Sequence, residues 1–344
     1  MIQPHGGNIY AASREYKIPA EKITDFSANI NPLGLYLSYP DPDCAGVKGA
    51  LSKYLGIPKS NILIGNGSIE IIYLIPRLII RPRVLIIGPT FSEYEKAVKI
   101  SEGTAKYVLT KEKSDFKLDP DSILPRLKGA DIVFICNPNN PTGVLFHKDE
   151  IKKIISKASK KTLTVIDEAF MDFVNTQGKF SFVKEALRIK NMLVIRSFTK
   201  FFGMAGLRIG FAVGNKDLIT RLGAFQYPWS VNTIAQMAAP IFIKDKVFIQ
   251  RSAALNERER SYLCLGLKKI RGLKVFEPAS NFILCKIENS RLNSAKLAGI
   301  LGRRGILIRD CGNFHGLSDK FIRVAVKKRT DNIKLLKALK WLNL

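Results

Sequence analysis

A lysine, two hydroxyl side chains and an arginine lie close together in one stretch of the chain. Lys200 follows Ser197 and Thr199, and Arg208 comes shortly afterwards. The hydroxyls and the guanidinium could neutralise a phosphate dianion. Burial and a neighbouring cation would lower the pKa of Lys200 and favour its neutral, nucleophilic form. Taken alone, the stretch is equally consistent with a solvated lysine on a loop.

A glycine turn is the second candidate for phosphate binding. Gly67 and Ser68 follow the apolar segment 61–64 and precede an apolar, helix-like segment at 69–78. The free N–H groups at the start of such a helix point toward one spot and suit an anion. Ser68 is placed to cap the helix or to bind the phosphate. Many glycine turns are only turns, so this pattern is weak evidence by itself.

Polar or aromatic residues also follow other strand-like segments. Asp167 follows residues 162–166, Asn140 comes soon after 131–135, and Phe91 comes soon after 83–87. These segments are mostly apolar rather than alternating, which is typical of strands covered on both faces. Ligands of open α/β sheets bind at the carboxyl ends of the strands. The alternative for the acidic pair at 167–168 is the first turn of a helix.

The surrounding elements predict an α/β protein with two domains and an N-terminal arm. We expect a large domain with a mainly parallel sheet covered by helices on both faces, and a smaller C-terminal α/β domain. The expected boundaries are 1–40 for the arm, which packs with the small domain, 41–235 for the large cofactor-binding domain, and 236–344 for the small domain. Helical segments at 216–224 and 234–267, the latter broken near 244–245, lead into the small domain. Its expected strands and helices lie at 273–276, 282–287, 294–303, 306–309, 321–326 and 330–342.

Composition excludes several classes of protein. The 344 residues are 46% hydrophobic and 24% charged, an ordinary globular balance. No apolar run reaches the ~18 residues of a membrane span, and the N-terminus has no signal-peptide pattern, so we expect a cytoplasmic protein. The five cysteines form no CxxC pair and the three histidines are scattered. We therefore expect no metal site and no disulfide framework.

The net charge of +26 raises the alternative of nucleic-acid binding. The excess is spread over many segments, and no basic-aromatic RNA motif or helix-turn-helix pattern occurs. A lysine-rich surface that attracts anionic metabolites explains the charge better. A basic nucleic-acid-binding protein remains a distant alternative.

Together, these residues match the chemical needs of pyridoxal phosphate. Lys200 would form a Schiff base with the aldehyde, and Asp167 would keep the pyridine nitrogen protonated so that the ring accepts electrons. Phe91 would stack on the ring, and Asn140 would hydrogen-bond its phenolic oxygen. The expected ligands of the phosphate end are Gly67, Ser68, Ser197, Thr199 and Arg208.

Residues 137–143, 167–170 and 197–210 resemble fold-type I pyridoxal-phosphate enzymes, the aspartate aminotransferase superfamily. The resemblance covers essentially the whole chain. Residues 5–10, 25–34 and 308–314 resemble threonine-phosphate decarboxylases of cobalamin biosynthesis, and histidinol-phosphate aminotransferases are next. The resemblance implies decarboxylation of O-phospho-L-threonine to 1-amino-2-propanol phosphate. The alternative is transamination of histidinol phosphate.

The resemblance also implies roles for individual residues and a homodimer. Arg309 and Arg323 would hold the phosphate and carboxylate ends of a small phosphorylated amino acid. From the residues alone, Arg323 could equally pair with a carboxylate, and Arg309 could be a solvated strand end. Phe170 replaces a tyrosine that often bonds the phenolic oxygen, which counts against an ordinary aminotransferase. The other implied contacts are His5, Gly6, Asn29 and Asn140 with the substrate, and Tyr54 with the partner's cofactor phosphate.

Overall fold

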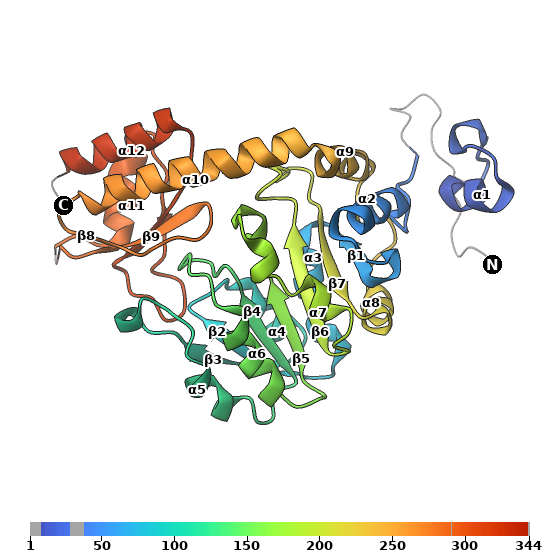
Figure 1. Cartoon of the computed structure of the whole chain (residues 1–344), viewed down its shortest axis with the longest axis horizontal. Helices are drawn as coiled ribbons and strands as arrows, with labels where there is room; N and C mark the ends of the chain where they lie inside the picture. Colours follow the sequence, from blue (N-terminus) through green and yellow to red (C-terminus); the bar gives the residue numbers. More distant parts are fainter. Residues whose placement is uncertain (1–7, 28–37, 290, 343–344) are drawn as a thin grey trace.

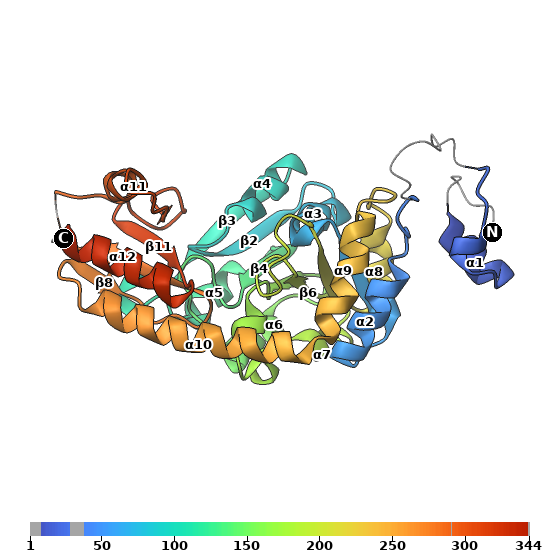
Figure 2. The same ribbon diagram turned by 90° about the horizontal axis from the view of Figure 1, so that it is seen from above.

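The computed structural model of the protein describes residues 8–27, 38–289 and 291–342. In Figure 1, a large domain occupies the centre and a smaller domain lies at one end, while the N-terminal helix lies at the other end. Figure 2 shows the same order from above, with the long helix α10 (Lys246–Lys268) running from the large domain to the small one.

The large domain is built on a seven-stranded sheet with the strand order β1-β7-β6-β5-β4-β2-β3. The five strands β3, β2, β4, β5 and β6 pair in parallel, whereas β7 pairs antiparallel with both β6 and β1. The predicted mainly parallel sheet is therefore confirmed. The strands are β1 (Ile62–Gly65), β2 (Arg83–Gly88), β3 (Thr104–Leu109), β4 (Ile132–Cys136), β5 (Leu163–Asp167), β6 (Met192–Ser197) and β7 (Gly210–Gly214).

Helices cover both faces of this sheet, because its central strands are apolar on both sides. One face packs against α3 (Gly67–Leu74), α4 (Glu93–Ile100) and α8 (Lys216–Gly223). The other face packs against α2 (Ala45–Leu55), α5 (Pro120–Ile123), α6 (Lys148–Lys157), α7 (Val183–Ala186) and α9 (Thr233–Lys244). Because the helices cover both faces, a ligand can reach the sheet at the polar ends of its strands.

The small domain has a four-stranded antiparallel sheet with the order β10-β11-β9-β8. Its core lies between this sheet and the helices α10, α11 (Ser294–Gly302) and α12 (Arg329–Trp341). The strands are β8 (Leu273–Val275), β9 (Phe282–Ile287), β10 (Arg309–Asp310) and β11 (Phe321–Ala325). The predicted break near residues 244–245 is confirmed, because α9 ends at Lys244 and Asp245 caps α10.

The N-terminal helix α1 (Ile9–Tyr16) lies beyond α2, at the opposite end from the small domain (Figure 2). Arg14 on α1 forms ion pairs with Asp41 at 3.3 Å and with Asp43 at 2.6 Å. Packing of the arm on the small domain stays a prediction, as does the division of the chain at 40 and 235. In the described part of the chain, no helix has the length and apolarity to cross a membrane.

Three local predictions were wrong or incomplete. The edge strand β3 was not predicted. The strand expected at 306–309 is largely absent, because β10 consists of Arg309–Asp310 and shares only Arg309 with that range. The helix expected at 69–78 ends as an α-helix at Leu74 and continues as a 3-10 helix over Ile75–Leu78. Pro76 lacks a backbone N–H, so it cannot continue the α-helical hydrogen bonding.

Candidate active site

Polar side chains from neighbouring strands come together at the carboxyl edge of the large sheet. Asp167 is the last residue of β5 and Ser197 is the last residue of β6. The two strands are parallel and pair Asp167 with Ile195, so both polar residues lie at the same edge. Lys200 lies just beyond β6, which brings it to this edge as the sequence predicted.

Asp167 is a buried carboxylate that has hydrogen bonds but no ion pair in the described residues. Its Oδ2 accepts a hydrogen bond from the Tyr94 hydroxyl at 2.7 Å, and its Oδ1 accepts one from the Ala169 N–H at 2.9 Å. Burial raises the pKa of Asp167, and these two hydrogen bonds and the charge of Lys200 oppose that rise. A cationic group of a bound ligand would stabilise the ionised form of this buried carboxylate.

Lys200 is held in an environment that favours the neutral amine. Enclosure by the protein lowers the pKa of Lys200, the cations Arg323 and Arg208 lower it further, and Asp167 opposes them. The Nζ atom of Lys200 lies 5.8 Å from the centre of the Phe170 ring and faces a pocket. A lysine with a lowered pKa at a pocket wall is a candidate nucleophile for a carbonyl carbon.

The predicted phosphate ligands come together around one glycine of β7. Gly210 pairs with Gly65 of β1 on one side and with Ser197 of β6 on the other. A Cβ atom at Gly210 would lie 2.3 Å from the Ser68 backbone nitrogen, so only glycine allows this approach. The start of α3 and the end of β6 are therefore neighbours.

The guanidinium of Arg208 lies beside Gly67 and completes this group of predicted phosphate ligands. Gly67 has a φ of +75°, and a Cβ atom there would lie 2.8 Å from Nη2 of Arg208. The absence of a side chain at Gly67 leaves room for the guanidinium beside the amino end of α3. Ser197 also accepts a hydrogen bond from the Thr199 N–H at 3.2 Å. The arrangement joins a helix N-terminus, hydroxyls and a cation, which is a suitable environment for a phosphate group.

A pocket of about 340 Å³ lies between the large and small domains. Lys200, Asn140 and Phe170 reach it from the large domain, and Arg309 and Arg323 reach it from the small domain. Phe91 also lines this pocket, so the structure brings together the aromatic, amide, amine and arginine residues that the sequence singled out. The volume lies in the usual range for small-molecule sites.

The two arginines lie directly opposite each other on neighbouring strands, because β10 and β11 pair Arg309 with Arg323. Arg323 donates a hydrogen bond to Oδ1 of Asn140, and its guanidinium carbon lies 5.0 Å from the centre of the Phe282 ring. Arg309 donates to Asn313 at 2.8 Å. Neither arginine has a carboxylate partner within the described ranges. Like charges directly opposite each other destabilise a sheet, so an anion bound here would relieve the repulsion.

The structure does not test the predicted contacts of four further residues. His5, Gly6 and Asn29 lie outside the described residues. Tyr54 packs against the large hydrophobic core, and burial raises its pKa, as does the nearby charge of Asp172. Contact of Tyr54 with a partner's cofactor stays a prediction.

The role of Tyr94 could not be predicted from the sequence. Its side chain is fully buried, its ring stacks on Phe134 at 4.7 Å, and its hydroxyl donates to Asp167. The predicted aromatic, Phe91, makes an edge contact with Tyr94 at 5.8 Å. The only available signal was the position of Tyr94 near the start of the helix that follows Phe91. Such a position does not reveal which carboxylate a hydroxyl will meet.

A second unpredicted feature is a buried ionic cluster behind the site. The guanidinium of Arg196 lies 2.9 Å from Glu168 and 2.8 Å from Asp172, and all three side chains are buried. Arg196 directly precedes Ser197, and Glu168 directly follows Asp167. The cluster therefore joins the ends of β5 and β6 at the two residues beside the site. The alternative that residues 167–168 form the first turn of an α-helix is wrong, because Asp167 is the last residue of β5.

These residues fit pyridoxal phosphate on structural grounds. Asp167 is a buried carboxylate that a ring cation would neutralise, and Lys200 is an amine with a lowered pKa. Gly67, next to Arg208, has no side chain and leaves an anion cradle at the start of α3. The fold and the site together define an enzyme of the fold-type I pyridoxal-phosphate class.

The comparisons with known proteins identify the family. The chain belongs to the aminotransferase class I and II family, whose model matches residues 13–339. A relative from Caldanaerobacter subterraneus, provisionally named a threonine-phosphate decarboxylase, is 36% identical over 98% of this chain and 93% of its own length. The histidinol-phosphate aminotransferase of Methanococcus aeolicus is 32% identical over 95% of this chain and 92% of its own length.

A solved structure supports the same conclusion. The histidinol-phosphate aminotransferase from Clostridium acetobutylicum aligns with a TM-score of 0.84 and 35% identity, covering 93% of this chain and 99% of that chain. The predicted superfamily and its cofactor are therefore confirmed, and the protein is a pyridoxal-phosphate-dependent enzyme. Both decarboxylases and aminotransferases are among its similar proteins.

Proposed function

We propose that this enzyme decarboxylates O-phospho-L-threonine to 1-amino-2-propanol phosphate, a step of cobalamin biosynthesis. The paired arginines carry the proposal. Arg309 and Arg323 border the same pocket as Lys200, and they are directly opposite each other in the sheet. Phosphothreonine has two anionic groups, a phosphate and a carboxylate, and offers one to each arginine. Histidinol phosphate has a phosphate but no carboxylate.

Phe170 is a second observation in favour of the decarboxylase. It lines the pocket, and its ring packs edge-on against Phe282 at 4.9 Å. Phenylalanine cannot donate a hydrogen bond to the phenolic oxygen of the cofactor. In this proposal Asn140, which Arg323 already contacts, is the principal partner of that oxygen.

In the proposed reaction, the chain orients the substrate and moves a proton. Pyridoxal phosphate, when bound, supplies an electron sink for the bond that breaks. Arg323 binds the carboxylate and directs it into the orientation in which its bond to the α-carbon breaks, so that it leaves as CO2. Lys200 then gives a proton to the α-carbon, which receives back the bonding electrons. Enclosure and the nearby arginines lower the pKa of Lys200, which makes its proton easier to transfer.

The second candidate is histidinol-phosphate aminotransferase. It is supported by the Methanococcus aeolicus relative and by the Clostridium acetobutylicum structure. In this alternative Lys200 removes the proton of the α-carbon, and a keto acid later takes the amino group. Both reactions use Lys200 for proton transfer, and they differ in which bond at the α-carbon breaks.

Incubation of the purified enzyme with phosphothreonine separates the two candidates. The proposal predicts release of one CO2 per substrate without any keto acid, and formation of 1-amino-2-propanol phosphate. Keto-acid-dependent turnover of histidinol phosphate, with no CO2 from phosphothreonine, would establish the aminotransferase instead. A colourless protein with salt-sensitive DNA affinity would contradict both candidates.

Replacing Arg323 by alanine should weaken binding of the substrate carboxylate. Loss of a hydrogen bond to a charged group costs about 1.5–3 kcal/mol, so KM for phosphothreonine should rise by about 10- to 150-fold. The visible absorbance of the cofactor should remain. Arg271→Ala is the matched control, because Arg271 is an exposed arginine of the small domain that does not line the pocket. An unchanged KM in Arg323→Ala would remove this residue from substrate binding.

We also propose that the enzyme is a homodimer that uses α9 in its interface. Ile234, Met237 and Ile241 are 55%, 64% and 67% exposed and recur at helical spacing, so they form an apolar stripe on one side of α9. The double substitution Met237→Glu/Ile241→Glu should convert a dimer to a monomer in sedimentation velocity. A monomeric wild-type protein at micromolar concentration would contradict the dimer.

A further inference from the structure

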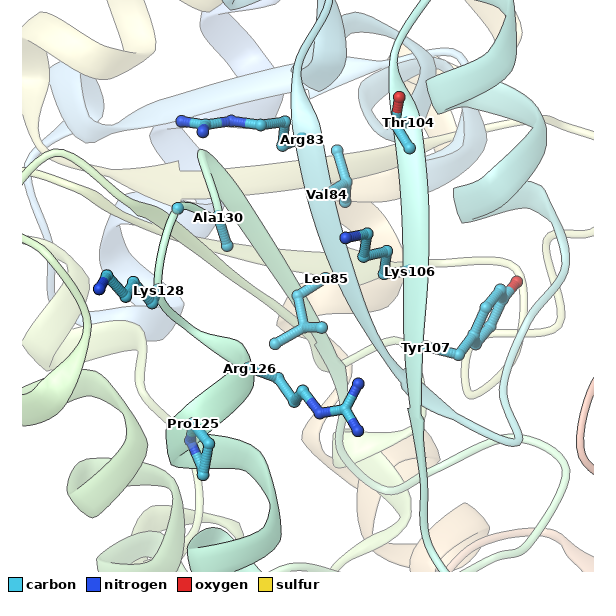
Figure 3. A pocket seen from close by; sticks show the side chains of 11 residues that line it. Arg83, Val84, Leu85, Thr104, Lys106, Tyr107, Pro125, Arg126, Lys128 and Ala130 are labelled. Carbon is cyan, nitrogen blue, oxygen red and sulfur yellow. The ribbon is translucent and has the colours of Figure 1, made fainter.

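A second cavity, of about 470 Å³, lies at the opposite edge of the large sheet from the candidate active site. Arg83 and Thr104, the first residues of β2 and β3, belong to its wall, together with the segment 125–130 (Figure 3). Asp167 and Ser197 are the last residues of β5 and β6, which run parallel to β2 and β3. The cavity is therefore at the amino ends of the strands and is a separate site.

The register of β2 and β3 places the side chains that build this cavity. The two strands are parallel and pair Arg83 with Thr104 and Leu85 with Lys106. Side chains alternate along a strand, so these four point to one face of the sheet. The helix α5 has four residues and is followed by a 3-10 helix over Leu124–Arg126, which leaves this corner of the face open.

Positive charge is concentrated in the cavity and is mostly unpaired. Four basic side chains line it, and none of its lining residues is acidic. Arg83 is neutralised by Asp131, at 2.9 Å. Lys106, Arg126 and Lys128 are exposed and have no ion pair with any described residue. Three uncompensated cations around one hollow create a positive potential that attracts an anion.

The floor of the cavity is apolar. Leu85 is 3% exposed, and Pro125 and Ala130 lie on the same wall. Figure 3 shows Arg83, Lys106 and Arg126 around Leu85, and Lys128 on the loop that leads to Ala130. A cavity of this volume suits a small organic ligand. Its lining is complementary to a ligand with an anionic end and an apolar body.

We propose that this cavity binds a phosphorylated organic molecule of nucleotide size. Its phosphates contact Lys106, Arg126 and Lys128, and its organic part lies against Leu85 and Pro125. Lysine and arginine together suit an oligophosphate, because lysine offers a compact charge and arginine a planar fork of donors. The site is additional to the proposed decarboxylation and does not depend on it.

Calorimetric titration of the pyridoxal-phosphate-loaded enzyme with ATP tests the proposal. Saturable binding is expected, and the triple variant Lys106→Gln/Arg126→Gln/Lys128→Gln should weaken it by at least about 100-fold. The control Lys216→Gln/Lys334→Gln/Lys337→Gln removes the same charge from exposed lysines on α8 and α12 and should leave the affinity unchanged. Equal weakening in both triple variants would show diffuse attraction by the basic surface and overturn the proposal.

Filling the cavity provides a test that leaves its charge unchanged. Thr104 is exposed on the edge strand, where tryptophan is well tolerated, so Thr104→Trp should block the cavity while the sheet still forms. ATP affinity should fall by at least about tenfold, and turnover of the enzyme's own substrate should persist in both the filled and the triple variant. ATP affinity that survives in both variants but is lost in Arg323→Ala would place the nucleotide in the active site. Lys106 would then serve only to protect the sheet edge, and the proposal would be wrong.

Discussion

Replacing Lys200 by alanine should remove the visible absorbance of the bound cofactor and nearly all turnover. Lys200 is the amine whose pKa is lowered by enclosure and by Arg323 and Arg208, and it faces the pocket. Loss of a general acid–base group alone lowers the rate by about 100- to 10,000-fold, and the covalent attachment of the cofactor is lost as well. The visible absorbance of the bound cofactor and steady-state turnover measure the two effects separately.

The control for this substitution is Lys216→Ala, which removes an exposed lysine at the start of α8. It should keep both the absorbance and the activity. A Lys200→Ala protein that retains both properties would contradict this role of Lys200, because another amine would then hold the cofactor.

Replacing Arg196 by methionine should cause a large loss of stability. The substitution leaves Glu168 and Asp172 buried without their cation, whereas burial already raises the pKa of both carboxyls. Breaking a buried ion pair by removing one partner costs about 3–5 kcal/mol. We expect this loss in the free energy of unfolding of the large domain, measured by guanidinium denaturation. Cofactor loading should fall with it, since Arg196 precedes Ser197 in the phosphate region.

Two further variants show whether the effect comes from unpaired charge. Arg81→Met breaks an exposed ion pair with Glu102, in which both side chains are more than 70% exposed, and should cost no more than about 1 kcal/mol. Glu168→Gln/Asp172→Asn/Arg196→Met removes all three charges and should recover part of the lost stability. If Arg196→Met costs no more than Arg81→Met, the cluster does not support the ends of β5 and β6.

The central strands could be predicted from sequence because they are apolar at nearly every position. Residues 131–135, 162–166 and 192–195 are close to β4, β5 and β6, which have fully buried patterns. The edge strand β3 could not be recognised in the same way. It carries exposed polar residues such as Thr104 and Lys106, and only one neighbour, β2, stabilises it. Whether an edge strand forms depends more on pairing with the rest of the sheet than on the strand's own sequence.

The candidate site could be predicted where a residue's position depends on a strand end. Asp167, Asn140 and Lys200 follow apolar strands, and all three come to the same edge of the sheet. Tyr94 and Arg196 could not be predicted, because their roles depend on partners distant in sequence. The Tyr94 hydroxyl meets a carboxylate at a sequence separation of 73 residues. The opposition of Arg309 and Arg323 similarly depends on the register of β10 and β11.

The role of Lys200 is tested most directly by reducing the cofactor-loaded enzyme with borohydride and mapping the modified peptide by mass spectrometry. We expect a single pyridoxyl-phosphate adduct, on Lys200, which lies just beyond β6 at the pocket wall. An adduct on a different lysine, or no adduct after saturating the protein with pyridoxal phosphate, would contradict it.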